Sequence, residues 1–341
     1  MRLMTMDVHH DTTTIAAFQG HARDLHKLDE GKVPTTIGDL KTYITGFPGK
    51  FTLVMEEGPL AAWLKRGLAP IAAEVIVADP RRNALIHSAE GKDDHIDVNS
   101  LQTLYVNKSL KEVHHTLDLK RQQFKDLVLH YHDVSRQVAA IKNKIIAFYH
   151  HVGVRPRGGA AYDPDRRAQA AADVRPHTDG AILDDLFAIL DQAVKVKQRI
   201  KANLERRSRA FSVIARLELV PGVGLITAVT FFAIIDTPDR FKRKSRLFKY
   251  CGLAVGNRSS NEKWLSRPGL LPSGNRLLKY VLISAAHNCC VQGADNPMRQ
   301  YFQALVARGV SEAAATNATA RKIACTLWGM WKNGSDYRSE L

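Results

Sequence analysis

The sequence predicts an α/β domain, followed by a long antiparallel helical hairpin and then an all-α domain. Three observations predict this order. Short strand-like and helix-like segments alternate at the N-terminus, an uninterrupted heptad of apolar side chains follows, and helical segments with short breaks fill the remainder. The expected domain boundaries are 1–110, 111–215 and 216–341.

The expected α/β domain consists of short segments with clear starts. Apolar and β-branched runs predict the strands, and Thr35 or Thr36, Pro59 and Pro80 are typical of helix starts. We expect strands over 3–8, 12–18, 22–28, 51–56 and 74–78, and helices over 36–45, over 59–67 and from Pro80 onward. The resulting order, βββαβαβα, is that of the ribonuclease H-like fold.

Two heptad series predict the helical hairpin. They are separated by residues 153–180, which are rich in Gly, Pro, Ala, Arg and Asp and are expected to form a flexible loop. The hairpin is either a plain helical core or a coiled-coil-like arm for self-association. The first series is Phe124, Leu127, Tyr131, Val134, Val138, Ile141, Ile145 and Phe148, and the second is Ile182, Leu186, Ile189, Ala193, Val196 and Ile200.

Helices alone account for the rest of the chain, and no sheet is needed there. We expect helices over 225–235, 277–290, 298–308 and 313–331. Pro221 to Gly224 precedes the first of these and has the form of a helix-hairpin-helix turn, in which glycines let backbone N–H groups approach phosphate oxygens.

The chain is strongly basic, and the charge is unevenly distributed. Its 341 residues include 49 Lys and Arg against 34 Asp and Glu, a net charge of +15 that favours a polyanionic partner such as nucleic acid. Residues 1–100 carry 11 basic and 14 acidic side chains, whereas residues 101–341 carry 38 and 20. We therefore expect the basic part to hold phosphates and the acidic part to serve another purpose.

Several classes of protein are disfavoured by the same sequence. The longest apolar run, over 225–235, is shorter than the roughly 20 residues of a membrane-spanning helix, and no signal peptide is recognisable at the start. We expect no membrane partner and a bacterial cytoplasmic protein that associates with the nucleoid when bound to DNA. The four cysteines, Cys251, Cys289, Cys290 and Cys325, lack metal-ligand spacing and are expected to be core thiols.

Four carboxylates are candidates for a metal site. Asp7 lies in the first expected strand and Glu56 ends the fourth, which is adjacent to it in a ribonuclease H-like sheet, while Glu57 is the alternative to Glu56. Asp94 and Asp97 are three residues apart and so share one face of a helix. Such oxygen ligands suit two Mg²⁺ ions, with Mn²⁺ as the alternative, for phosphodiester chemistry.

Candidate nucleic-acid ligands lie in the basic part. Ser259 and Ser260 follow a Gly-containing segment there, and spacing alone gives no reason to regard either as a nucleophile. The candidates are Gly222 and Gly224 in the glycine turn, the run Arg240, Lys242, Arg243, Lys244 and Arg246, and Arg258.

Taken together, these motifs resemble those of the DEDD-motif insertion-sequence transposases, a family related to the Piv-type DNA invertases, over nearly the whole chain. Asp7, Glu56, Asp94 and Asp97 match the four acids of that family's RuvC-like domain. The later matches, in the family's order, are Pro221 to Gly224, Arg240-Phe241, Tyr250 to Leu253, Ser273 to Asn275 with Leu277 and Leu278, and Arg321-Lys322.

The resemblance implies a function for the serine segment. In the family, a serine in the position of Ser260, with Ser259 as the alternative, attacks the DNA phosphate and forms a covalent phosphoserine link. It also implies homodimers or homotetramers assembled through the arms and, for many members, a structured guide RNA.

We therefore expect a transposase or site-specific recombinase that cleaves and rejoins DNA through Ser260 and Mg²⁺-bound carboxylates. The alternatives are a RuvC-like structure-specific nuclease, a DNA invertase and an inactive nucleic-acid-binding copy.

Overall fold

The structure is a computed structural model in which the chain divides into two compact units, Met1–Leu119 and Lys120–Leu341. Each unit is described by itself. The first corresponds to the expected α/β domain, and the second contains both the expected helical hairpin and the expected C-terminal domain. The described residues are 1–21, 24–80, 94–156, 158–256, 259–260, 263–264, 269–292 and 295–338.

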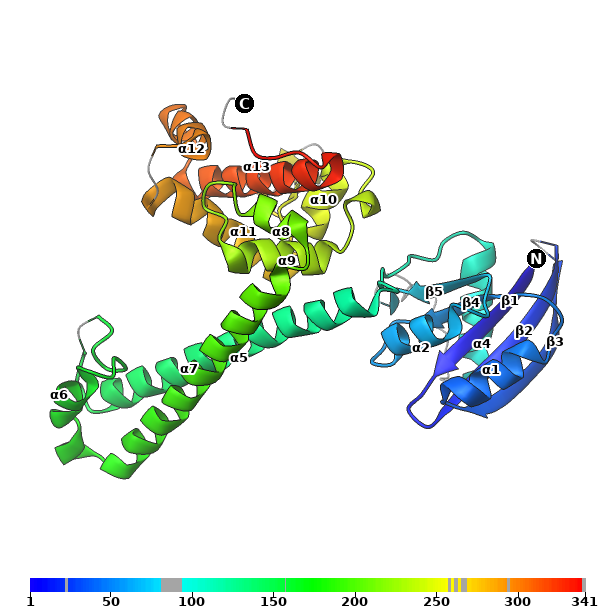
Figure 1. Cartoon of the computed structure of the whole chain (residues 1–341), viewed down its shortest axis with the longest axis horizontal. Helices are drawn as coiled ribbons and strands as arrows, with labels where there is room; N and C mark the ends of the chain where they lie inside the picture. Colours follow the sequence, from blue (N-terminus) through cyan, green and yellow to red (C-terminus); the bar gives the residue numbers. More distant parts are fainter. Residues whose placement is uncertain are drawn as a thin grey trace. The chain divides into compact units, whose positions relative to one another are not determined.

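A five-stranded sheet organises the first unit (Figure 1). Its strands are ordered β3-β2-β1-β4-β5; β1 pairs antiparallel with β2 and parallel with β4, and β5 continues the parallel side. The expected order of strands and helices up to the fifth strand is confirmed. The strands are β1 (Arg2–Val8), β2 (Thr12–His21), β3 (Asp24–Pro34), β4 (Thr52–Glu56) and β5 (Glu74–Ala78).

Helices pack on both faces of this sheet. Successive residues of each strand contact the helices of opposite faces in turn. Helices α1 (Ile37–Thr45) and α2 (Ala61–Leu68) enclose a core that includes Met4, Met6 and Met55. Helix α4 (Asp94–Val106) packs on the opposite face, against Leu3 and Val54 among others. Thr36 is the N-cap of α1, where its side chain accepts a hydrogen bond from the Asp39 N–H.

The direction of α4 follows from a pocket beside the sheet. Met1, which precedes β1, lines this pocket together with Tyr105 and Val106 from the end of α4. Helix α4 therefore runs antiparallel to β1, and its first residue, Asp94, lies toward the carboxyl end of the strand. The helix expected from Pro80 falls largely on residues 81–93, outside the described residues.

An antiparallel pair of long helices, α5 (Leu119–His151) and α7 (Gly180–Ser208), forms the start of the second unit (Figure 1). Residues near the start of α5, such as Phe124 and Val128, share a core with Ile200 and Leu204 near the end of α7. At the other end, residues of α5 and α7 meet in a separate core whose members include Val138, Ile145, Tyr149, Leu183, Phe187 and Leu190.

The connection between these helices is not the unstructured loop that its composition predicted. It contains α6 (Arg167–Ala172) and a 3₁₀ turn, η1 (Arg175–His177), and it buries Ala171 and Val174 against the two long helices. Arg167 binds the Asp191 carboxylate on α7 through two hydrogen bonds of 2.7 Å, and Arg175 pairs with Asp184. Bidentate ion pairs and buried alanines thus close the end of the hairpin.

The heptad prediction is right for most positions of both helices and wrong at the start of α7. On α5, Phe124, Tyr131, Val134, Val138 and Ile145 are buried as expected. On α7, Ile200 is buried and Leu186, Ala193 and Val196 pack against the cores, whereas Ile182 and Ile189 are 48% and 54% exposed. Near the start of α7 the buried residues are instead Leu183, Phe187 and Leu190, so the packing face there is displaced by one residue from the predicted stripe.

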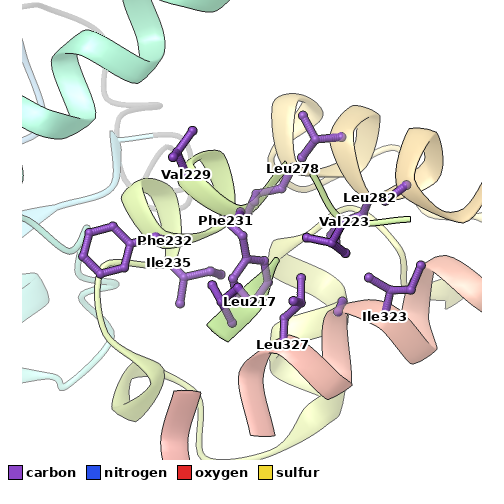
Figure 2. Close-up of a cluster of buried hydrophobic side chains, with 14 of the residues drawn as sticks. Leu217, Val223, Val229, Phe231, Phe232, Ile235, Leu278, Leu282, Ile323 and Leu327 are labelled. Carbon is purple, nitrogen blue, oxygen red and sulfur yellow. The ribbon is translucent and has the colours of Figure 1, made fainter. Parts of the chain in front are cut away.

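The C-terminal core surrounds a helix that is apolar on every side, α9 (Leu225–Ile235), in which Ala228 to Ile235 are all buried. Figure 2 shows Leu217, Leu278, Leu282, Ile323 and Leu327 converging with its side chains. The helices around it are α8 (Ser212–Leu217), η2 (Pro238–Arg240), α10 (Lys244–Tyr250), α11 (Arg276–His287), the π-helical turn η3 (Asn288–Gln292), α12 (Pro297–Ala307) and α13 (Glu312–Asn333).

The expectation of a purely helical C-terminal domain is wrong at one segment. Two short antiparallel ladders follow α10. The outer ladder pairs β6 (Val255–Gly256) with β9 (Gly269–Leu270), and the inner one pairs β7 (Ser259–Ser260) with β8 (Lys263–Trp264).

The cysteines and the helix lengths agree with the sequence-based expectations. Cys251, Cys289 and Cys290 are buried free thiols, and Cys325 is half-buried. Within the described ranges, no helix combines the length and the apolar character that crossing a membrane would require.

We predict that acidification destabilises the second unit through His132, a residue of α5 that is 7% exposed. Its Nε2 lies 2.8 Å from Thr230 Oγ1 on α9, and that hydroxyl donates to the Ile226 carbonyl, so the neutral imidazole is the donor. Burial, assisted by Arg136, lowers the pKa of His132 from 6.5 to about 4. As the pH falls, the unfolded chain therefore binds a proton at His132 before the folded protein does. The free energy of unfolding should fall by roughly 3 kcal/mol as the pH decreases from the ordinary pKa of histidine to the lowered pKa of His132.

The measurement is urea unfolding at a series of pH values. Because other groups also titrate, the informative quantity is the difference from His132→Gln, which retains an N–H donor without titrating. That difference should be constant above pH 6.5 and should shift as the pH falls toward 4. Parallel stability curves for the two proteins would contradict the prediction.

Candidate active site

Strand pairing places Asp7 beside Glu56. In the parallel ladder of β1 and β4, Met6 is paired with Met55, and Asp7 and Glu56 are the next residues of the two strands. Side chains alternate between faces, so Asp7 shares the α4 face with Leu3, and Glu56 shares it with Val54. The sequence-based expectation that the first and fourth strands are neighbours is confirmed.

Helix α4 brings the remaining acids to the same end of the sheet. Asp94 is its first residue and Asp97 belongs to its first turn, and α4 runs antiparallel to β1 across the face that bears Asp7 and Glu56. The first turn of α4, which includes Asp94 and Asp97, thus lies toward the end of the sheet where β1 and β4 bring Asp7 beside Glu56. The side chain of Asp94 lies outside the described part of the structure.

The chemistry of this donor set fits a hard divalent cation. It consists of carboxylates, whose oxygens are the ligands that Mg²⁺ takes in proteins. The Asp7 side chain is 19% exposed, which leaves it accessible from solvent at the end of its strand. Among the described side chains, which leave out that of Asp94, no three His, Cys, Asp or Glu are gathered closely enough to hold a metal ion.

Two histidines contact the acids of this region, and sequence reasoning did not single them out. The Nε2 atom of His9 lies 2.9 Å from the Asp7 carboxylate. The Nε2 atom of His115 lies 2.5 Å from the carboxylate of Glu57. His9 could have been found from its position two residues after Asp7, whereas His115 is 58 residues away from Glu57 and has no local signal. The contact to His115 distinguishes Glu57 from Glu56.

The predicted nucleophile belongs to the second unit. Ser260 and its neighbour Ser259 form β7, where Ser259 pairs with Trp264 and Ser260 with Lys263. Their side chains lie outside the described residues, as does the whole of Arg258. Backbone pairing places both serines on the inner of the two ladders that extend from the helical core.

The two glycines of the predicted phosphate-binding turn differ in their surroundings. Gly222 has φ +80°, and a Cβ added there would lie 2.3 Å from the Ala285 carbonyl oxygen and 2.7 Å from the Cys289 Cβ. Gly224 is the N-cap of α9, and nothing lies within 4 Å of a Cβ added there. Close packing against the end of α11 therefore requires Gly222, while Gly224 borders open space.

The predicted basic run divides into exposed and engaged side chains. Lys242, Arg243, Lys244 and Arg246 are exposed at the start of α10. Arg240 donates from Nη1 to the carbonyls of Ile234 and Ile235, at 3.0 and 2.8 Å, and its guanidinium lies 4.7 Å from the Tyr250 ring centroid. Arg240 thus closes the C-terminus of α9, a structural contact that the spacing of basic residues did not indicate.

Residues 214–303, which include α9, α10, the serine segment and α11, match the family model described as transposase IS116/IS110/IS902 family. Over these residues the chain is similar to the transposases of this insertion-sequence family. The matched segment begins within α8 and ends within α12.

Three curated relatives agree with this assignment. An uncharacterized 43.6 kDa protein of insertion element IS110 from Streptomyces coelicolor is 28% identical over 161 residues, 47% of this chain and 38% of the relative. The transposase for insertion sequence element IS1111A from Coxiella burnetii is 28% identical over 154 residues, 44% of this chain and 39% of the relative. A putative transposase, y4qE, from Sinorhizobium fredii is 35% identical over 75 residues, 22% of this chain and 19% of the relative. The chain thus spans about two fifths of the first two relatives.

We predict that Gly222→Ala destabilises the second unit by about 2–4 kcal/mol, since the new methyl group meets a backbone carbonyl at a positive φ. Gly224→Ala should cost about 1 kcal/mol or less, because its surroundings are open. Denaturant unfolding of the two variants measures the difference. Equal losses of stability would contradict the assignment of Gly222 to packing.

Proposed function

We propose that this chain is a transposase that cleaves and rejoins DNA strands, with the carboxylates of the first unit binding Mg²⁺ and Ser260 acting as the nucleophile. The observation that carries the proposal is the pairing of β1 with β4, which sets Asp7 beside Glu56 at the end of the sheet where α4 begins, in a chain whose residues 214–303 match a transposase family model. On the same grounds, we propose that the first unit is a RuvC-like, ribonuclease H-like domain and that Pro221 to Gly224 form a helix-hairpin-helix turn.

The residues that would hold the metal are Asp7, Glu56, Asp94 and Asp97. When bound, Mg²⁺, with Mn²⁺ as the alternative, supplies positive charge that stabilises the phosphoryl group during transfer. Of the chain's own groups, His9 holds the Asp7 carboxylate in one orientation through its 2.9 Å contact. Glu57, whose carboxylate is bound to His115, is the alternative to Glu56.

Serine attack accounts for cleavage and for rejoining. The Ser260 oxygen forms a bond to phosphorus, its proton leaves to a base, and the bond from phosphorus to the DNA leaving oxygen breaks. A DNA hydroxyl then attacks the phosphoserine, which restores the phosphodiester and returns the serine. Because one ester replaces another, rejoining requires no nucleotide cofactor.

The basic side chains and the arm have roles in the same proposal. Lys242, Arg243, Lys244 and Arg246 are exposed and suited to contacts with the DNA backbone. We propose that the arm assembles homodimers or homotetramers in coiled-coil fashion, and the exposed Ile182 and Ile189 support this proposal. A structured guide RNA is a further proposed partner, supported by the net charge of +15.

We expect Asp94→Asn to reduce recombination by about two to three orders of magnitude, because it removes a charged ligand. Asp7→Asn and Glu56→Gln should do the same, while Glu57→Gln should retain activity. An independent measurement is Mn²⁺ binding followed by electron paramagnetic resonance, in which the three active-site substitutions should weaken binding. If Glu57→Gln lost Mn²⁺ binding and Glu56→Gln retained it, the assignment of Glu56 would be overturned.

We expect the protein to form a covalent adduct with DNA that survives detergent, and Ser260→Ala to form none. Ser259→Ala is the matched control and should retain the adduct. Denaturing electrophoresis with end-labelled DNA measures both variants, and mass spectrometry locates the modified serine. An adduct that persists in Ser260→Ala would reject the serine assignment, and hydrolysed products without any adduct would favour a nuclease.

A further inference from the structure

We propose that the outward face of α11 forms a subsite for an unpaired deoxynucleotide of the DNA strand, with Tyr280 stacking on the base and Arg276 and Lys279 contacting its phosphates. This inference rests on the proposed strand chemistry but concerns different residues. The subsite is a groove of about 520 Å³ between α11 and α13. Its lining comprises Arg276, Lys279, Tyr280, Ile283, Ser284, His287 and Asn288, together with Thr316 of α13.

The groove residues occupy one face of α11, opposite to the face that builds the core. Leu278 and Leu282 point into the core beside α9, as Figure 2 shows. Arg276, Tyr280, Ile283 and His287 recur at intervals of three or four residues, which places them together on the other side of the helix. The helical spacing therefore gathers these side chains on one surface of α11, while the opposite surface of the helix packs in the core.

Tyr280 is unusual among the large side chains of this unit. It is 65% exposed, more than any other large hydrophobic side chain in the described ranges. Proteins bind unpaired bases with an exposed aromatic ring flanked by cations. Every base has a flat face that can stack on the ring, so this contact does not depend on the base sequence. Within a duplex the bases stack on one another, so the ring selects single-stranded nucleotides.

The charge of the groove suits the phosphates on either side of such a base. Its lining includes the cations Arg276 and Lys279 and the titratable His287, and it includes no Asp or Glu. None of the ion pairs found among the described residues involves Arg276 or Lys279. Both side chains are thus suited to phosphate oxygens.

The groove is joined to the segment that carries the proposed nucleophile. The stem of Lys279 passes Gly252, where an added Cβ would lie 3.5 Å from the Lys279 Cβ and Cδ. The Asn275 N–H, just before α11, donates to the Tyr250 carbonyl at 2.7 Å. The turn at 250–252 leads into β6 and then β7 with its two serines. This continuity favours the DNA strand undergoing exchange as the occupant.

The test uses the full chain and a short single-stranded oligodeoxynucleotide, with a duplex of the same sequence for comparison. Tyr280→Ala should weaken binding of the single strand roughly tenfold or more and change duplex binding little. Tyr280→Phe retains the ring and should bind as the unsubstituted protein does. Thermal unfolding checks that each variant is folded.

Probes with a single abasic residue, moved along the strand, test stacking directly. When the abasic residue occupies the position that stacks on Tyr280, the probe should bind the unsubstituted protein as weakly as the intact probe binds Tyr280→Ala. Combining that abasic probe with Tyr280→Ala should weaken binding no further, because both changes remove the same contact. Unchanged binding by Tyr280→Ala, or equal losses on every probe, would overturn the proposal. A Tyr280-dependent preference for single-stranded RNA of the same sequence would overturn the assignment to DNA.

The experiments distinguish a failure of the proposed serine mechanism from a failure of the proposed groove. Binding is measured in Ser260→Ala, where no strand chemistry is expected and the groove is intact. Tyr280-dependent binding without adduct formation by the unsubstituted protein would support the groove and contradict the serine mechanism. Adduct formation without Tyr280-dependent binding would contradict the groove alone.

Discussion

A helix that is apolar on every side has to be enclosed on every side, and this constraint shapes the second unit. The eight buried residues of α9 from Ala228 to Ile235 are covered by α8, α11 and α13 and by the start of α5. Burial of aliphatic and aromatic side chains contributes about 25 cal/mol for each Å² removed from water. The enclosure of α9 therefore unites the start of α5, the end of α7 and the C-terminal helices in one core.

Enclosure leaves the polar groups of α9 without water, and side chains from other elements satisfy them. Arg240 binds the carbonyls of Ile234 and Ile235. Arg121 of α5 binds the carbonyl and the carboxylate of Asp236 and lies 4.8 Å from the Phe232 ring centroid. Two cations thus meet the carbonyl end of the helix, where the helix dipole favours positive charge. Charges that a sequence pattern assigns to nucleic acid can be required by the core.

What could be predicted from the sequence is what periodicity and local chemistry specify. Alternation and β-branched residues located β5 at Glu74–Ala78, and continuous hydrophobicity located α9 at Leu225–Ile235. The packing face was displaced only at the start of α7, since Ile182 and Leu183 are both apolar and only the partner helix determines which is buried. The two ladders after α10 are two residues per strand, too short for any periodic signal.

The candidate site shows the same division. The pairing of β1 with β4 followed from strand order, and it brings Asp7 beside Glu56. The contact of His115 with Glu57 depends on where the chain returns after α4, and the contact of Gly222 with Ala285 depends on how α11 crosses the turn. Both contacts join residues that are far apart in the sequence, so the local sequence around each residue does not predict them.

The outer ladder closes the serine-bearing segment at its base. Val255 pairs with Leu270, and the Leu271 N–H donates to the Ala254 carbonyl at 2.8 Å. Because the two ends are held together, lengthening the chain between them costs only the slowly rising entropy of a larger loop. The outer ladder therefore fixes both ends of the segment that bears Ser259 and Ser260 relative to the helical core, whatever the length of chain between them.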